Sequence, residues 1–179
     1  LDCYTALPLV VGYYVVKTLR NNQIPAQLKW PNDVLLHERK LAGILVETTK
    51  DASGHWVFVI GVGLNLKVDN ASFEADYGVA GVGEVPGSSL DKYFWLKKLS
   101  RAIVDAVADR KSNGLSSIQE AWDKISAYKN DWVEITYEDG TVCSAQILGI
   151  DEQGCLLVNQ NGHVNKLMSG MVKIRKRLM

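Results

Sequence analysis

The sequence predicts an α+β fold, in which a region of helices and strands precedes a smaller region made only of strands. Residues 7–19 are apolar on nearly every side, and residues 90–110 repeat apolar side chains at helical spacing. From Asp131 onward, short alternating runs are separated by Asp-Gly and Asn-Gly pairs, which favour hairpin turns. We therefore predict two domains, residues 1–129 and 130–179.

The composition indicates a chain with a packed core. Of the 179 residues, 47% are hydrophobic and 22% are charged, which argues against disorder. The 20 basic residues are balanced by 20 acidic ones, so a zero net charge argues against non-specific nucleic-acid binding. No apolar run approaches the roughly 18 to 20 residues that span a bilayer, so we expect no membrane association.

The cysteines and histidines predict neither a disulfide framework nor a metal site. The cysteine count is odd and the spacing is wide: Cys3, Cys143 and Cys155. This usage is typical of a reducing compartment, so we expect a cytoplasmic protein. None of the three histidines lies near a cysteine at the spacing of zinc ligands.

The first elements are a helix and three strands. Residues 7–19 predict a mostly buried helix, with Pro8 tolerated in its first turn. Strands are predicted at 27–36, with a break at Pro31, and at 41–48 and 56–64. The loop "TKDASGH" is short and turn-rich, so the second and third strands should be antiparallel neighbours.

A glycine-rich irregular loop is predicted at residues 67–88, followed by two helices. Ser88 or Ser89 is the expected N-cap of the first helix, with Asp91 in its first turn and its end near Arg110. The second helix should span about 115–127, with Trp122 packed in the core.

The C-terminal region predicts five short strands: "DWVEITY", "TVCSAQILGI", "GCLLVNQ", "HVNKLM" and "MVKIR". Turn signals lie between them, including Asp139-Gly140 and Asn161-Gly162. Five strands within about 50 residues favour a small closed barrel, because closure removes exposed sheet edges.

Charged residues gather in the stretch "LKWPNDVLLHERKLAGILVE", residues 28–47. Lys29, Asp33 and Lys40 lie at strand ends or in a turn, where side chains can converge on a pocket. Lysines there could neutralise phosphate oxygens, and a carboxylate could orient a metal or an attacking amine. On composition alone, a solvated hairpin remains the alternative.

The later stretch "GVGLN", residues 61–65, adds two glycines that allow a ligand to approach a strand closely. Asn65 can both donate and accept hydrogen bonds. The stretch is neither a P-loop nor a dinucleotide fingerprint, because it lacks GxxxxGK[ST] as well as a third glycine with a following helix.

In this order, "KWPNDV", "RKLAGILVE", "IGVGLN", paired helices with "AWDK" and a five-strand tail, the sequence resembles the bacterial biotin protein ligases. The similarity runs from about residue 7 to 175, and the sister lipoate ligases do not carry both of the first two blocks. The resemblance implies part of a mixed sheet with helices, like the catalytic domain of class II aminoacyl-tRNA synthetases. It also implies that the C-terminal barrel is SH3-like.

The resemblance implies a two-step ligase that uses ATP, biotin and Mg²⁺. ATP and biotin give biotinyl-5′-AMP and pyrophosphate, and a lysine of a biotin carboxyl carrier protein then attacks the adenylate. Matched by position, Lys40 contacts biotin and the adenylate phosphate, and Asp33 aligns or deprotonates the acceptor lysine. The implied binding residues are Lys29, Asn32, Gly43, Gly61, Val62, Gly63 and Asn65. Lys29 either contacts the ligand or supports the turn, which Trp30 and Pro31 shape, and Arg39 is a surface neighbour of Lys40.

One family feature is absent from the sequence. The family carries a GRGRxG loop upstream of KWPND, and this chain, which begins at Leu1, has none. We therefore expect the C-terminal part of a ligase, with half of the biotin pocket upstream and no activity of the chain alone. A non-catalytic binding or dimerisation fragment is the alternative. The strand around Leu45 to Thr49 is the expected homodimer interface, and DNA binding would require an upstream winged helix-turn-helix.

Overall fold

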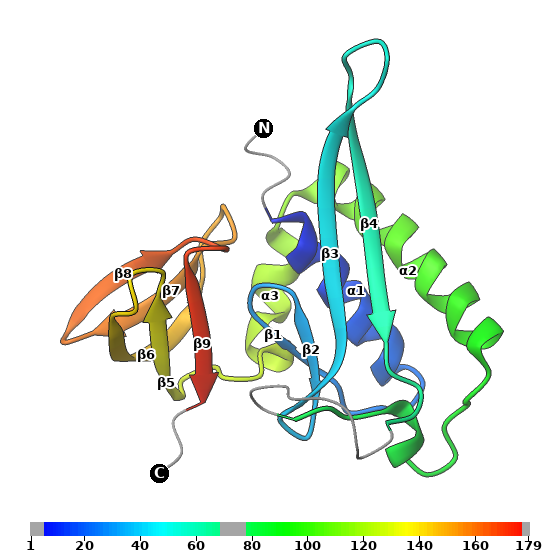
Figure 1. Cartoon of the computed structure of the whole chain (residues 1–179), viewed down its shortest axis with the longest axis horizontal. Helices are drawn as coiled ribbons and strands as arrows, with labels where there is room; N and C mark the ends of the chain where they lie inside the picture. The colour runs from blue at the N-terminus through cyan, green and yellow to red at the C-terminus, as the bar shows by residue number, and fades with distance from the viewer. Residues whose placement is uncertain (1–5, 69–77, 177–179) are drawn as a thin grey trace.

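The computed structural model describes residues 6–68 and 78–176 (Figure 1). It contains two antiparallel sheets and three α-helices, so the α+β prediction is confirmed. Within these residues, no helix combines the length and the apolar character needed to cross a membrane.

The first sheet has four strands in the order β1-β2-β3-β4. Its strands are β1 (Gln27–Lys29), β2 (Asp33–Leu36), β3 (Arg39–Lys50) and β4 (Trp56–Leu64). The predicted break at Pro31 is confirmed, because residues 30–32 form the turn between β1 and β2. The β3–β4 hairpin is also confirmed, and Figure 1 shows its tip extending beyond the helices.

Helices cover one face of this sheet: α1 (Leu7–Arg20), α2 (Lys92–Asn113) and α3 (Ser116–Ile125). Ile44 belongs to the hydrophobic core, and Val62 packs against it. Their neighbours along the strands face the other way, so Leu45 and Val59 are 59% and 53% exposed. Helix α1 approaches the sheet closely at Gly12, where a Cβ atom would lie 2.6 Å from Leu28 Cδ1.

The start of α2 differs from the prediction. Ser88 and Ser89 were expected as the N-cap, but the cap is Asp91, whose carboxylate accepts a 2.8 Å hydrogen bond from the Tyr93 N–H. An aspartate satisfies the free amides at a helix start as well as a serine does, so sequence alone did not separate the two. Of the predicted irregular loop, residues 82–84 form a short 3-10 helix, η1 (Val82–Glu84), and residues 69–77 lie outside the described residues.

The second sheet contains the five predicted C-terminal strands, in the order β8-β7-β6-β5-β9. They are β5 (Trp132–Tyr137), β6 (Val142–Ile150), β7 (Leu156–Gln160), β8 (His163–Leu167) and β9 (Val172–Lys176). Gly140 and Gly162 have φ values of 83° and 84° in the turns, as the Asp-Gly and Asn-Gly pairs predicted. These strands pair only with one another among the described strands.

Trp30 joins the two sheets directly. Its indole Nε1–H donates a 2.9 Å hydrogen bond to the carbonyl of Gly154, in the loop between β6 and β7. Trp30 is 4% exposed, so this bond lies in the core. The second sheet therefore supports the turn that leads into Asp33.

We expect Trp30→Phe to destabilise the protein by about 1 to 3 kcal/mol, because it leaves the buried Gly154 carbonyl without its indole donor. The loss should appear as a lower midpoint of chemical denaturation. Trp132→Phe is the matched control, because Trp132 is 51% exposed. Equal stability of the two variants would contradict a structural role for the Trp30–Gly154 bond.

Candidate active site

Two lysines surround the carboxylate of Asp33 at the first residue of β2. Lys40 Nζ lies 2.6 Å from Asp33 Oδ1, and Lys29 Nζ lies 3.8 Å from Oδ2. The side chains of Lys29 and Asp33 are only 9% and 15% exposed, whereas that of Lys40 is 39% exposed. The three charges sum to +1, and the most accessible of them is the Lys40 ammonium, which suits the binding of an anion.

Gly43 allows Lys40 to reach Asp33. In the register of β2 and β3, Gly43 lies opposite Asp33, and a bulge between Val34 and Leu35 shifts the pairing near Lys40. A Cβ atom on Gly43 would lie 3.3 Å from Lys40 Cε and 3.4 Å from its Nζ. Any larger residue would crowd the lysine, so the glycine sets the path of its side chain.

A cavity of about 520 Å³ opens beside these charges. It is lined by Asn32, Asp33, Lys40, Gly43, Ile44, Leu45, Gly61, Val62 and Gly63. Seven of the nine predicted site residues are therefore brought together, and they come from β2, β3, β4 and the turn before β2. Pairing of Gly43 with Gly63 and of Leu45 with Gly61 leaves the floor of the cavity with few side chains.

Ile44 and Leu45 line the cavity although the sequence placed neither in the site. The available signal was their position beside Gly43, because Leu45 shares a sheet face with Gly43, Gly61 and Gly63. The exposed Leu45 side chain adds apolar surface to the cavity that Lys40 also lines.

Asn32 holds the turn against β3. Its side-chain Nδ2 donates a 2.8 Å hydrogen bond to the Ile44 carbonyl, and the Ile44 N–H donates to the Asn32 carbonyl at 2.9 Å. This double contact fixes the backbone immediately before Asp33.

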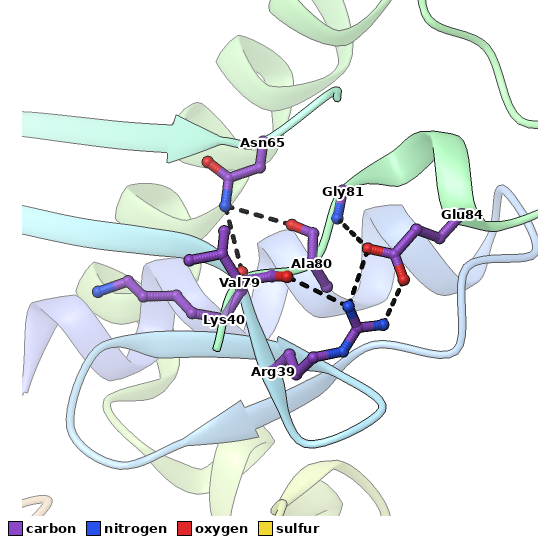
Figure 2. A network of polar contacts seen from close by, with 7 residues as sticks. All are labelled: Arg39, Lys40, Asn65, Val79, Ala80, Gly81 and Glu84. Carbon is purple, nitrogen blue, oxygen red and sulfur yellow. Dashed lines mark hydrogen bonds and ion pairs between the residues drawn. The ribbon is translucent and has the colours of Figure 1, made fainter. Parts of the chain in front are cut away.

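Asn65 and Lys29 do not line the cavity. Asn65 Nδ2 donates to the carbonyls of Lys40 and Ala80, at 3.2 Å each, and Figure 2 shows its amide oxygen pointing away from both. Lys29 pairs with Asp33 and also borders a small gap between the two sheets, next to Tyr128. Burial raises the pKa of Tyr128 to about 12, with further contributions from the charges of Glu38, Asp131 and Asp33, so its phenol stays neutral.

The described residues offer no cluster of three or more His, Cys, Asp or Glu side chains that could hold a metal ion. The carboxylate of Asp33 is already paired with ammonium groups. The residues of this site therefore do not fit a Mg²⁺ ion bound by the protein alone.

A second cavity, of about 550 Å³, lies between α1 and α2. Its lining includes Tyr14, Lys17, Phe94, Lys98 and Arg101, and none of the predicted site residues. The Lys40 cavity is the better candidate for chemistry, because its glycine-lined floor lies beside the paired Lys40 ammonium and Asp33 carboxylate and it contains seven of the nine predicted site residues.

Residues 2–65 match the model described as the "Biotin/lipoate A/B protein ligase family". This range contains every residue that lines the Lys40 cavity. The match thus relates residues 2–65, and the site within them, to the class of biotin and lipoate ligases.

Curated relatives narrow this class. The "Bifunctional ligase/repressor BirA" of Escherichia coli (strain K12) is 32% identical over 174 residues, which cover 94% of this chain and 53% of the relative. The "Biotin--[acetyl-CoA-carboxylase] ligase" of Paracoccus denitrificans is 31% identical over 140 residues, covering 73% and 55%. The chain thus spans about half the length of the curated relatives that it matches.

Solved structures of biotin protein ligases have a similar fold. A biotin protein ligase from Aquifex aeolicus in complex with biotin and ATP superposes with a TM-score of 0.81 at 25% identity, over 96% of this chain and 72% of that one. Its apo structure gives a TM-score of 0.82 at the same identity, over 96% and 75%. The chain is therefore similar to biotin protein ligases over nearly its whole length, in agreement with the resemblance that the KWPND and RKLAGILVE blocks indicated.

Proposed function

We propose that the protein is a biotin protein ligase, which activates biotin with ATP and transfers it to a lysine of a biotin carboxyl carrier protein. The observation that carries this proposal is the Lys40–Asp33 pair at a glycine-lined cavity, in a fold that matches a ligase bound to biotin and ATP. The proposed substrates follow from the family resemblance and from the similarity to a biotin--[acetyl-CoA-carboxylase] ligase and to a ligase in complex with biotin and ATP.

In the first step, a carboxylate oxygen of biotin attacks the α-phosphorus of ATP, and the bond to pyrophosphate breaks. The negative charge on the phosphate and the carboxylate would lie beside Lys40, whose ammonium is the accessible cation of the site. A fixed charge aimed at the reacting group stabilises the transition state more strongly than water does.

In the second step, the amine of the acceptor lysine attacks the acyl carbon of the adenylate, and AMP leaves. An ammonium must lose a proton before it can attack, and Asp33 is the carboxylate of the site that can take or orient it. The partial exposure of Asp33, at 15%, is consistent with contact from the cavity side.

The remaining site residues receive binding roles. Gly43, Gly61, Val62 and Gly63 would form the surface on which biotin lies, because they provide backbone amides and carbonyls with little side-chain bulk. Asn32 would border it. For Asn65, the amide oxygen that points away from its two carbonyl partners is the group available to the adenine side. For Lys29, burial favours support of the turn over direct ligand contact.

We propose ATP and biotin as the small-molecule substrates, and we propose that Mg²⁺ enters with the phosphates of ATP. Mg²⁺ is commonly held by substrate phosphates, water and few protein groups. This assignment is compatible with a site whose carboxylate is already paired.

We also propose two domains, residues 1–129 and 130–179. The first would be part of a class II synthetase-like catalytic sheet, and the second an SH3-like barrel. The strands of residues 27–64 form one hydrogen-bonded sheet and those of residues 132–176 form another, which supports this division.

A homodimer through β3, around Leu45 to Thr49, is part of the proposal. Strand β2 pairs with β3 only as far as Gly43, and the described residues from Glu47 to Lys50 are exposed. Sedimentation equilibrium tests this pairing. DNA binding belongs to the proposal only for a protein that also contains a winged helix-turn-helix; the name of the Escherichia coli relative includes a repressor function.

The test of the proposed function separates the two steps. The natural protein that carries this chain is incubated with biotin, ATP and Mg²⁺, and pyrophosphate release is followed. A biotin carrier domain is then added, and its mass is measured for the attachment of one biotin. We expect both products, and absence of pyrophosphate release would reject the ligase assignment.

A further inference from the structure

Arg39 and Glu84 form an ion pair outside the cavity, next to Lys40 in the chain and in space (Figure 2). Both terminal guanidinium nitrogens face the carboxylate: Arg39 Nη2 donates to Glu84 Oε2, and Nη1 lies 3.3 Å from Oε1. Glu84 Oε1 also accepts a 2.9 Å hydrogen bond from the Gly81 N–H, and Arg39 Nη1 donates to the Val79 carbonyl at 3.2 Å. The pair thus fastens residues 79–84 to the first residue of β3.

This segment and the preceding residue, Gly78, contact both backbone polar groups of Lys40. The Lys40 N–H donates a 3.1 Å hydrogen bond to the Gly78 carbonyl, and the Lys40 carbonyl accepts a 2.9 Å bond from the Ala80 N–H. Asn65 links the same two segments, because its Nδ2 donates to the carbonyls of Lys40 and Ala80. In Figure 2, this network lies on the side of the Lys40 backbone away from its ammonium.

We propose that Arg39 and Glu84 are positioning residues that set where the Lys40 ammonium lies in the cavity. This inference rests on the proposed function, because the ligand-binding role of Lys40 is itself proposed. Neither Arg39 nor Glu84 lines the cavity, but Arg39 is bonded to Lys40, which does, so the backbone of Lys40 provides the route by which the pair acts.

The geometry around Lys40 leaves little room for displacement of its side chain. Its side chain passes over Gly43, where an added Cβ atom would lie 3.3 Å from Lys40 Cε, and ends 2.6 Å from Asp33 Oδ1. A shift of the Lys40 backbone by a fraction of an ångström would therefore change the distance from its ammonium to a bound anion. Such misplacement is costly for reactions that depend on aligned groups.

The methylene groups of Arg39 contribute as well as its charge. A Cβ atom on Gly78 would lie 3.3 Å from both Arg39 Cγ and Cδ, so the arginine stem covers the glycine whose carbonyl accepts from Lys40. The hydrogen bonds from Arg39 lower the pKa of Glu84, with smaller contributions from the Gly81 amide and from the charges of Arg39 and His37, although partial burial opposes the shift. The ion pair is therefore complete at neutral pH.

The test uses Glu84→Gln, Arg39→Gln and the double variant in the natural protein. The matched control is Arg101→Gln, which breaks an exposed pair with Asp105 on α2, with 3.0 Å between Arg101 Nε and Asp105 Oδ1. Amide hydrogen exchange of Lys40 and Ala80 is measured first. We expect it to become about tenfold faster in each single variant, with no further increase in the double variant, and to stay unchanged in the control.

The second measurement is the KM for biotin in adenylate formation. We expect a rise of about 5- to 20-fold for Glu84→Gln, from a misplaced charge-assisted contact. In a Lys40→Ala background, the same substitution should cause no further change, which separates positioning of Lys40 from general loss of structure.

Unchanged exchange at Lys40 and Ala80, or an equal KM effect of Glu84→Gln with and without Lys40, would overturn the inference. If the wild-type protein releases no pyrophosphate, the proposed ligase function fails instead. The exchange measurement still decides in that case whether Arg39 and Glu84 hold the backbone of Lys40.

Discussion

Replacing Lys40 with alanine is expected to slow biotinyl-adenylate formation about 30- to 1,000-fold. The variant removes a charge-assisted contact to the group where negative charge develops, and such contacts contribute about 2 to 4 kcal/mol to transition-state stabilisation. Lys40 is the accessible cation at the cavity, at 39% exposure, and the other lysine of the site is almost buried. Lys29 is therefore poorly placed to substitute for it.

The measurement is the initial rate of pyrophosphate release with saturating ATP and biotin. Lys50→Ala is the matched control, because Lys50 is an exposed lysine at the far end of the same strand, over the Trp56 ring. The control should keep wild-type activity. A Lys40→Ala variant that folds and forms the adenylate at the wild-type rate would remove Lys40 from the mechanism.

Much of the fold could be predicted because the signals were local. Proline in the 27–36 segment, glycine-containing turns after residue 130 and helical spacing in 90–110 each act within a few residues. Element ends were less predictable. Helix α2 continues to Asn113, beyond the predicted end near Arg110, because its C-cap is Gly114 with a φ of 64°. The choice of Asp91 over Ser89 as the N-cap also depended on the path of the preceding loop.

The site was predictable where family motifs and strand pairing coincide. The KWPND and RKLAGILVE blocks lie on β2 and β3 and their turns, so pairing of Asp33 with Gly43 brings the predicted residues to one cavity. The contact of Arg39 with Glu84 was not predictable, because 45 residues separate the pair and Glu84 belongs to no motif. The contacts of the Asn65 amide with the carbonyls of Lys40 and Ala80 were missed because the motif suggested a hydrogen-bonding residue without indicating which groups it would contact.

The other large effect is expected for Asp33→Asn, which should separate the two steps of the reaction. The asparagine side chain has nearly the same shape but cannot accept a proton, so transfer to the carrier lysine should fall about 100- to 10,000-fold. Adenylate formation should change less than about tenfold, because Lys40 keeps its charge and loses the carboxylate that competes with the phosphate for it. Preformed biotinyl-5′-AMP isolates the second step, which is followed by the mass of the carrier domain.

Asp33→Asn also removes a countercharge from Lys29, whose side chain is 9% exposed. Taking one partner from a buried pair costs about 3 to 5 kcal/mol, so the variant should be less stable in chemical denaturation, and kinetics should be measured well below its unfolding transition. The control is Asp123→Asn, whose carboxylate is 71% exposed and lies 2.8 Å from Lys129 Nζ. Exposed pairs contribute about 0 to 1 kcal/mol, so this control should retain both stability and transfer. If Asp33→Asn instead lowered both steps by the same factor, Asp33 would act only by holding the two lysines, and the acceptor amine would be activated by another group.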